Sequence, residues 1–358
     1  MLLKDLFEFL PKSKHNAATG SDIGDYPFLT SSNTINKYSE FHEYKGEHLV
    51  IGDGGVGNCK YVNFEFSASD HNYILKPKEN TNCKAVYYFL LKDDYKILNE
   101  GFKGVGIKNV AKSYLQNIDF RYNAKYSLEQ IVESLDRINN YIDKGNYHIN
   151  LLDELVKSRF IEMFGDPVKN EKKFKTMHLS KVCPFNTYKD NVEEFDGKVW
   201  LLNLDMVESN TGNIIDKLYV DEKKVGNSTI KFDNNCVLYS KLRPYLNKVV
   251  IPDSSGYATS ELIYLEINDK IINKYYLAEL LRSESFVKYI NSKTAGAKMP
   301  RVSMNHFRDF ELMIPNIEEQ TQFAQVIKQI DKSKFNVQKR IDFYKELLEK
   351  KMDEYFND

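Results

Sequence analysis

Apolar residues recur along two long stretches of the chain with the alternating spacing of a heptad repeat, in Ser127–Asp166 and in Glu319–Asp358. This spacing places a stripe of apolar side chains on one face of a helix, and its persistence over several heptads is typical of a coiled coil. We therefore predict long helices near 127–164 and 318–356. The seam residues expected to make the helix–helix contact are Ile131, Leu135, Ile138, Ile149, Leu152, Phe323, Ile327, Ile330, Ile341 and Leu348.

The two heptad stretches are also similar to each other, which indicates an internal duplication. Farther upstream the similarity continues with a one-residue drift that pairs Asp70 with Glu261. A period this long indicates a duplicated domain and not a solenoid. Because both copies share one heptad register, we predict that the helices pack on each other as an antiparallel coiled coil with pseudo-twofold symmetry; ordinary amphipathic core helices are the alternative. Matching pairs in an ungapped alignment include Gln130/Gln322, Ile138/Ile330, Ile149/Ile341, Glu154/Glu346, Phe164/Phe356 and Asp166/Asp358.

The stretches before the two helices have the patterns of mixed domains. The predicted class is α+β, with two tandem mixed α/β domains that are each followed by a long helix. Predicted strands are 47–51, 61–66 and 73–76 in the first copy and 199–204, 237–239 and 262–267 in the second, with helices at 85–91 and 274–281 in comparable places. The predicted segments are domain 1 at 1–122, spacer helix 1 at 123–166, domain 2 at 167–315 and spacer helix 2 at 316–358.

Charge and cysteine content narrow the class of protein. Fifty basic and fifty-one acidic residues leave a formal net charge of −1, so a nucleic-acid surface would have to be local. The four cysteines are widely spaced without a Cys-x-x-Cys pair, which favours a reducing compartment and predicts a cytoplasmic protein. No apolar run approaches the roughly 20 residues of a membrane span, and we expect no membrane association.

The sequence has few signs of catalytic chemistry. Gly52–Gly57 matches the dinucleotide pattern G-x-G-x-x-G, but that motif must open a helix, whereas a strand pattern follows here. We therefore predict a hairpin or a close backbone approach at these glycines. The scattered histidines form no metal-binding spacing. We predict neither catalytic nor metal-binding residues, although distant side chains could still converge in space.

Basic loops without acidic residues recur in both copies, at 101–117 and 285–308. Lysines neutralise phosphates, glycines let the backbone approach them, and Arg, Tyr and Asn suit base edges. Solvated basic loops are the alternative, but their recurrence favours a role in DNA binding. The candidate DNA-binding residues are Ser31, Ser32, Asn33, Asn58, Lys60, Lys103, Lys108, Lys112, Lys241, Arg243, Tyr245, Lys293, Lys298 and Arg301.

Three segments carry a resemblance to a known family: Gly296–Ser303, Met313–Gln320, and Leu151–Phe160 with its continuation to Pro167. With the repeated order of domain and helix, the chain resembles the specificity subunit of a type I restriction–modification system over almost its whole length. Asn109 stands where the second copy has Arg301, and the first domain lacks the usual aromatic lead-in before Leu3.

The resemblance implies a non-catalytic subunit without a cofactor of its own. Each domain would read one part of a bipartite double-stranded DNA target, and the helices would bind two methyltransferase subunits that use S-adenosylmethionine. Restriction (motor) subunits that use ATP and magnesium could join the complex, whose role would be phage defence.

Two other classes stay open at this point. A nuclease, or the recognition half of a fused restriction–modification enzyme, would need a metal–carboxylate site or a methyltransferase motif, and neither is visible in the sequence. A structural protein that assembles partners through its coiled coil would not need the paired basic loops.

Overall fold

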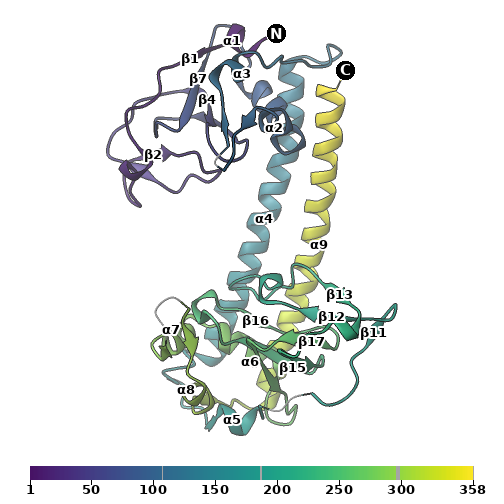
Figure 1. The fold of residues 1–358 in the computed structure, drawn as a ribbon. Coiled ribbons are helices and arrows are strands. Elements are labelled where there is room, and N and C mark those ends of the chain that lie inside the picture. The colour runs from purple at the N-terminus through teal and green to yellow at the C-terminus, as the bar shows by residue number, and fades with distance from the viewer. Residues whose placement is uncertain (107, 186–187, 296–298, 358) are drawn as a thin grey trace. The chain divides into compact units, whose positions relative to one another are not determined.

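The computed structural model describes residues 1–358 except 107, 186–187, 296–298 and 358 (Figure 1). The chain forms two compact units: unit 1 is Met1–Asn146 with Gln338–Asp358, and unit 2 is Tyr147–Val337. Two long helices, α4 (Leu128–Phe164) and α9 (Ile317–Phe356), each contribute to both units. Each unit therefore contains one mixed domain, the beginning of the helix that follows it and the end of the other helix.

Unit 1 is built on an antiparallel sheet with the strand order β1-β7-β4-β5, against which α2 packs. A smaller sheet has the order β3-β2-β6, and β8 pairs with β9. The backbone of α2 leaves the helical conformation at Lys92–Tyr95. The elements are α1 (Leu3–Leu6), β1 (Phe7–Phe9), a 3₁₀ turn (Ala17–Thr19), β2 (Tyr26–Leu29), β3 (Tyr38–Ser39), β4 (Glu47–Gly52), β5 (Cys59–Asn63), β6 (Ser67–Ala68), β7 (Asn72–Pro77), α2 (Cys83–Asn99), β8 (Phe102–Lys103), β9 (Asn109–Val110) and α3 (Lys112–Gln116).

Unit 2 has a three-stranded sheet of order β16-β15-β18 and a five-stranded sheet of order β11-β12-β17-β14, in which β13 also pairs with β12. Two short pairs, β10-β21 and β19-β20, complete it. Its elements are β10 (Thr176–His178), α5 (Leu179–Val182), β11 (Glu194–Phe195), β12 (Lys198–Leu202), β13 (Leu218–Val220), β14 (Thr229–Phe232), β15 (Cys236–Ser240), β16 (Val249–Val250), β17 (Gly256–Thr259), β18 (Leu262–Glu266), α6 (Lys274–Arg282), α7 (Glu284–Asn291), β19 (Thr294–Ala295), β20 (Arg301–Val302), α8 (Met304–Arg308) and β21 (Glu311–Met313), with 3₁₀ turns at Leu204–Met206, Glu222–Lys224 and Pro244–Leu246.

The long helices begin and end at residues suited to helix termini. At the start of α4, the backbone N–H of Gln130 donates to Ser127 Oγ (3.2 Å) and the Ser127 N–H donates to Gln130 Oε1 (2.9 Å), which is a capping box. The helix stops at Gly165, whose φ of 76° lies in the left-handed region that glycine tolerates. Asn316 caps α9 by accepting from the Glu319 N–H at 3.0 Å. The predicted helices near 127–164 and 318–356 are thereby confirmed.

In each unit the two long helices run in opposite directions. In unit 1, the Tyr355 hydroxyl donates to Ser134 Oγ (3.0 Å). Farther along α4, the Tyr141 ring stacks on the Tyr344 ring. Partner numbers therefore fall on α9 as they rise on α4. The same order of contacts is found in unit 2. Asp153 forms an ion pair with Lys334, and farther along α4 the Phe160 ring contacts the Phe323 ring at 5.6 Å. The antiparallel direction is thus found in each unit, and a continuous coiled coil with pseudo-twofold symmetry stays a prediction.

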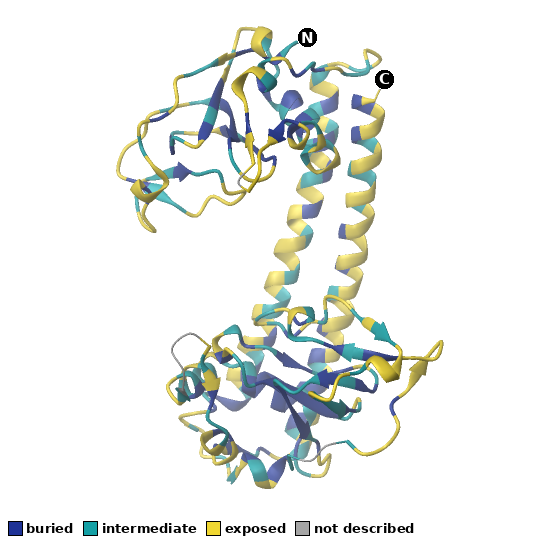
Figure 2. Cartoon of the chain, in the orientation of Figure 1, coloured by how far each residue is buried: buried dark blue, intermediate teal, exposed yellow. Residues whose placement is uncertain are grey.

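The predicted seam is turned away from solvent (Figure 2). All its residues are buried except Ile149, Leu152 and Leu348, which are half-buried. At the helix ends, part of this burial comes from the domains. Phe356 of α9 contacts Phe89 and Phe120 in the core of unit 1.

The equivalent residue of α4 does the same in unit 2. Phe164, which aligns with Phe356, contacts Tyr276 at 4.8 Å and Phe323 at 5.5 Å in the core of that unit. Each domain core is thus closed by the last turn of a long helix. The heptad pattern had two interpretations: a helix–helix seam, or an amphipathic face that packs on a domain core. Both interpretations apply at the helix ends.

The predicted strands and short helices are all present, with shifted ends. The largest shift is in α2, which continues to Asn99 although the predicted helix ends at 91; among the strands it is in β5, which ends at Asn63, so that 64–66 lie outside it. Gly52 ends β4, and 53–58 form the connection of the β4–β5 hairpin, so these glycines open no helix, as predicted. The fold class of two tandem mixed α/β domains, each followed by a long helix, is confirmed.

Candidate nucleic-acid interface

In unit 1 the glycine-rich turn of the β4–β5 hairpin is fastened to the basic loop around β8 and β9. The loop 52–58 and the stretch 108–110 run side by side through backbone contacts, so the two loops form one surface. These contacts are the hydrogen bonds from the Gly55 N–H to the Lys108 carbonyl (2.9 Å) and from the Val110 N–H to the Asp53 carbonyl (3.0 Å), with a β-bridge between Gly54 and Asn109.

Unit 2 contains the same arrangement between the loop 241–248 and the stretch 300–302. The sequence offered these two stretches as separate candidates, and the structure joins them. The contacts are the hydrogen bonds from the Arg243 N–H to the Pro300 carbonyl (2.8 Å) and from the Val302 N–H to the Lys241 carbonyl (2.9 Å), with a β-bridge between Leu242 and Arg301. We call this set of three contacts the loop brace.

A fourth backbone contact aligns the two braces and corrects the sequence alignment. The Asp53 N–H donates to the His71 carbonyl (3.1 Å), and the Lys241 N–H donates to the Glu261 carbonyl (3.0 Å). His71 therefore occupies the place of Glu261, whereas the sequence paired Glu261 with Asp70. The error is one residue, because a short Ser–acid match outweighed the strand register.

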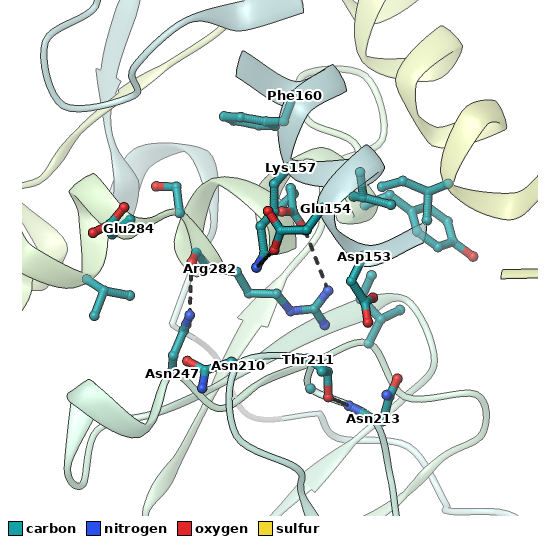
Figure 3. A pocket seen from close by; sticks show the side chains of 18 of the residues that line it. Asp153, Glu154, Lys157, Phe160, Asn210, Thr211, Asn213, Asn247, Arg282 and Glu284 are labelled. Carbon is teal, nitrogen blue, oxygen red and sulfur yellow. Dashed lines mark hydrogen bonds and ion pairs between the residues drawn. The ribbon is translucent and has the colours of Figure 1, made fainter. Parts of the chain in front are cut away.

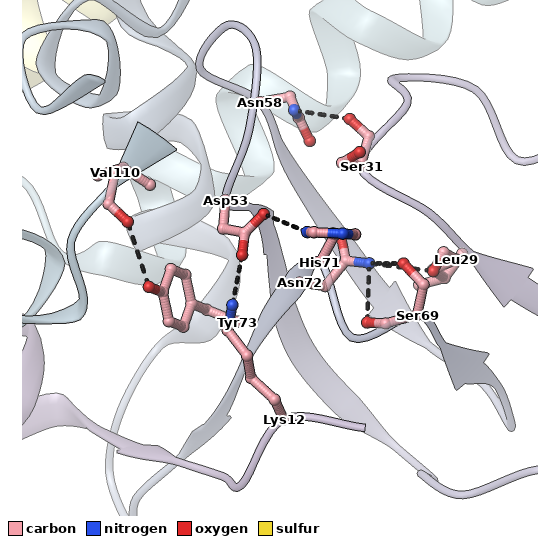
Figure 4. A network of polar contacts seen from close by, with 10 residues as sticks. All are labelled: Lys12, Leu29, Ser31, Asp53, Asn58, Ser69, His71, Asn72, Tyr73 and Val110. Carbon is pink, nitrogen blue, oxygen red and sulfur yellow. Dashed lines mark hydrogen bonds and ion pairs between the residues drawn. The ribbon is translucent and has the colours of Figure 1, made fainter. Parts of the chain in front are cut away.

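A polar network joins the brace of unit 1 to its sheets (Figure 4). Asp53 forms an ion pair with Lys12 and lies 3.2 Å from His71 Nδ1, while the Tyr73 hydroxyl donates to the Val110 carbonyl at 3.2 Å. Sequence reasoning missed these roles because Lys12, Asp53 and His71 lie far apart in the chain.

Asn58 and Lys60 are buried, so their side chains hold the neighbouring loop in place. Asn58 Nδ2 donates to the Ser31 carbonyl (3.0 Å), and Lys60 Nζ donates to the Thr30 carbonyl (3.2 Å). Burial lowers the pKa of the Lys60 ammonium below its usual value. These two residues therefore position the segment 30–34, which carries Ser31 as a half-buried residue and Ser32 and Asn33 as exposed ones.

The remaining cations predicted in unit 1 are exposed. Lys103 ends β8, Lys108 lies in the brace, and Lys112 begins α3 with its ammonium 5.8 Å from the centre of the Phe9 ring. Three exposed lysines beside a glycine-rich turn make a local positive surface on a chain whose net charge is −1.

The predicted DNA-binding residues of unit 2 differ in whether their side chains are paired and in how far they are exposed. Arg301 is paired with Glu261 at 2.7 Å although its side chain is 58% exposed. Arg243, Tyr245 and Lys293 are exposed, and Lys241 is half-buried. Lys298 lies outside the described residues.

Unit 2 also contains a cleft of about 2120 Å³ beside the end of α4 (Figure 3). Arg282 lies in its wall. Its Nη2 donates to the Val249 carbonyl at 2.7 Å, and its Nη1 lies 3.9 Å from a carboxylate oxygen of Glu279. Burial raises the pKa of Glu279 and lowers that of Arg282. Among the described residues, no predicted DNA-binding side chain lines this cleft.

The part of the chain that the structure describes has few features of a metal-binding site or of a reactive thiol. No group of three or more His, Cys, Asp or Glu side chains there could hold a metal ion. All four cysteines are free and buried, and burial raises the pKa of the Cys59 and Cys183 thiols to about 12, which keeps them protonated near neutral pH. None of the described helices is long and apolar enough to cross a membrane.

The repeated domain, the long helix after each copy and the loop brace in both copies define a duplicated protein with two equivalent pairs of joined loops. The family model described as the type I restriction modification DNA specificity domain matches residues 1–151 and 171–342. The chain therefore belongs to this family of specificity subunits, as its resemblance implied.

Relatives agree with this assignment over most of their length. The specificity subunit of the type I restriction enzyme EcoDI from Escherichia coli is 20% identical over 93% of this chain and 81% of its own. That of the enzyme MjaVIII from Methanocaldococcus jannaschii is 29% identical over 91% and 84%. The crystal structure of a type I S subunit from M. genitalium has a TM-score of 0.62 at 12% identity, covering 100% of this chain and 96% of that one, and shows the same fold.

Proposed function

We propose that this chain is the non-catalytic subunit that gives a type I restriction–modification complex its DNA specificity. Each mixed domain binds one half of a bipartite target in double-stranded DNA through its loop brace. The observation that carries this proposal is the recurrence of the same three backbone contacts in both copies, beside exposed cations in each. Backbone-fixed loops with lysines suit phosphate contacts, which set position, while a few side chains read bases.

The proposed division of the chain follows the sequence: reading domains at 1–122 and 167–315, and spacer helices at 123–166 and 316–358. Within the proposed interface, the buried Asn58 and Lys60 act by holding the segment 30–34, and the exposed candidates contact the DNA. The chain needs no cofactor in this role, since S-adenosylmethionine, ATP and magnesium belong to the partner subunits. Four free cysteines suit a reducing compartment such as the cytoplasm.

The helices are proposed to bind two methyltransferase subunits. On α4, Tyr147, Leu151 and Leu155 follow one another at four-residue intervals, and all three are exposed. Residues at this spacing lie on one face of a helix, and exposed apolar stripes commonly mark protein–protein contacts. A helix of the methyltransferase is the partner that this stripe fits.

The function is tested by expressing the chain with and without its methyltransferase partner and mapping adenine methylation in the host DNA. We expect methylation at one bipartite, asymmetric motif with both proteins and none with the chain alone. Methylation or cleavage by the purified chain, or methylation without a motif by the complex, would contradict the proposal.

The docking stripe has its own test. Leu151→Asp with Leu155→Asp should prevent copurification of the methyltransferase, because the charges cannot be buried in an apolar contact. Ile23→Asp, at an exposed apolar residue of unit 1, is the matched control and should leave copurification intact. Retention of the partner by the double variant would place its binding site elsewhere.

A further inference from the structure

The residue at the turn of the loop brace has an unusual backbone conformation in both copies. Gly55 and Arg243 occupy equivalent places, since each donates its N–H to the equivalent carbonyl of Lys108 or Pro300. Their φ angles are 91° and 48°, both in the left-handed region. Glycine adopts this conformation freely, whereas an arginine there is strained, by about 1 kcal/mol or more.

The arginine at this strained position is directed to solvent without a partner. Arg301 is held by Glu261 and Arg282 by the Val249 carbonyl. Among the described residues, the Arg243 guanidinium has neither a hydrogen-bond nor an ion-pair partner, and the side chain is exposed. A rigid backbone thus presents a guanidinium fork, the group that binds O6 and N7 of guanine in the major groove.

The loops that the brace joins in unit 1 present apolar side chains instead. Gly55 has no side chain, and the next residue, Val56, is 67% exposed. Val105 is fully exposed between Gly104 and Gly106, whose φ angles are 140° and 91°. The only apolar group that base pairs display in the major groove is the C5 methyl of thymine.

We infer that the loops joined by the brace determine base specificity in both domains: unit 2 reads guanine with Arg243, and unit 1 reads thymine methyl groups with Val56, in the loop 52–58, and Val105, between β8 and β9. This inference rests on the proposed function. It assigns the type of base contact to each domain, which membership of the family does not.

The arginine is tested with Arg243→Gly, which gives unit 2 the turn residue of unit 1. The full chain with its methyltransferase partner selects duplexes from a pool of randomised DNA, and bound sequences are counted. We expect one guanine of one half-site to lose about 5- to 150-fold in discrimination while the other half-site is unchanged. Thermal unfolding should show no loss of stability, because glycine suits the backbone there.

The control is Asp196→Gly, which also removes an exposed charged side chain at a left-handed position of unit 2, with φ of 50°. It should leave the selected motif intact. If Arg243→Gly selects the same motif as the unchanged chain, the inference about Arg243 is wrong although the proposed function stands. If the unchanged complex selects no motif at all, the proposed function itself fails.

The valines are tested with DNA in which deoxyuridine replaces thymine, so that only the methyl group is removed. Replacement in the half-site of unit 1 should weaken binding by about four-fold for each contacted thymine, the effect of burying one methyl-sized group. The variant with Val56→Ala and Val105→Ala should lose this difference between thymine and uracil. Ile23→Ala, another exposed apolar residue of unit 1, should keep it. Equal sensitivity of the double variant and the unchanged complex would overturn the assignment for unit 1.

Discussion

Tyr141 and Tyr344 stack face to face, with ring centres 4.8 Å apart and ring planes 9° from parallel. Within unit 1 the two rings form a direct contact between α4 and α9. An aromatic pair contributes about 0.5–1.5 kcal/mol beyond the area it buries. We therefore expect Tyr141→Ala to lower the free energy of unfolding by about 1 kcal/mol or slightly more, measured by urea denaturation.

The control for this pair is Tyr147→Ala on the same helix, at a residue that is 64% exposed. It should change stability much less. A double-mutant cycle with Tyr344→Ala isolates the pair, and a coupling energy near zero would show that the stacked rings do not stabilise the helices.

Phe356 tests whether the end of α9 completes the core of unit 1. Its side chain is buried against Phe89 and Phe120, and truncation of a buried Phe costs about 3–5 kcal/mol. Phe356→Ala should therefore lower the unfolding temperature of unit 1 strongly. Phe343→Ala, on the same helix and 59% exposed, should have a small effect. Similar losses from both variants would mean that the helix end is not part of this core.

Lys293 is exposed in the acid-free loop of unit 2 and should contact a phosphate. Lys293→Ala should weaken binding to all DNA sequences alike and reduce the slope of log K against log salt by about 1. Fluorescence anisotropy over a salt series measures both quantities. Lys332→Ala, at an exposed lysine on α9, should leave the slope as it is. A changed motif with an unchanged slope would instead assign Lys293 to base reading.

Helix length should set the number of unread bases in the target. Inserting seven residues after Asn146 in α4 and after Val337 in α9 preserves the heptad phase and lengthens each helix by about 10 Å. At about 3.4 Å per base pair, the unread spacer should grow by about three base pairs while both half-sites stay the same. Methylome sequencing reads this directly. Insertions of two residues, which break the phase, should destroy activity, and an unchanged spacer after the seven-residue insertions would separate helix length from target geometry.

The sequence predicted the long helices and six of the strands because these depend on local periodicity, and it predicted the duplication because the two helix stretches align without gaps. Ile138 and Ile330, for example, are marked by heptad spacing alone, and both are buried. The contacts of the loop brace could not be predicted in this way. The hydrogen bond between Arg243 and Pro300 joins residues far apart in the chain, and the φ of Arg243 has no signature in its side chain.

The burial of polar residues among the DNA-binding candidates could likewise not be predicted from the sequence. Asn58 and Lys60 are polar residues of the kind found in DNA-binding loops. However, Asn58, just before β5, and Lys60, within it, direct their side chains inward to the backbone of the segment 30–34. The one-residue error that paired Asp70 with Glu261 has a related cause, since strand register is set by partners and not by local similarity.

The closure of unit 1 by the last turn of α9 has a consequence for how the protein is made. The first domain leaves the ribosome early, but Met352, Tyr355 and Phe356, which complete its core, are translated only after the whole second domain. Contacts between such distant parts of a chain form slowly, because a long loop must close first. A polypeptide that is cut short before Met352 therefore leaves its first domain with an open apolar core, and cellular proteases can remove it before it binds DNA.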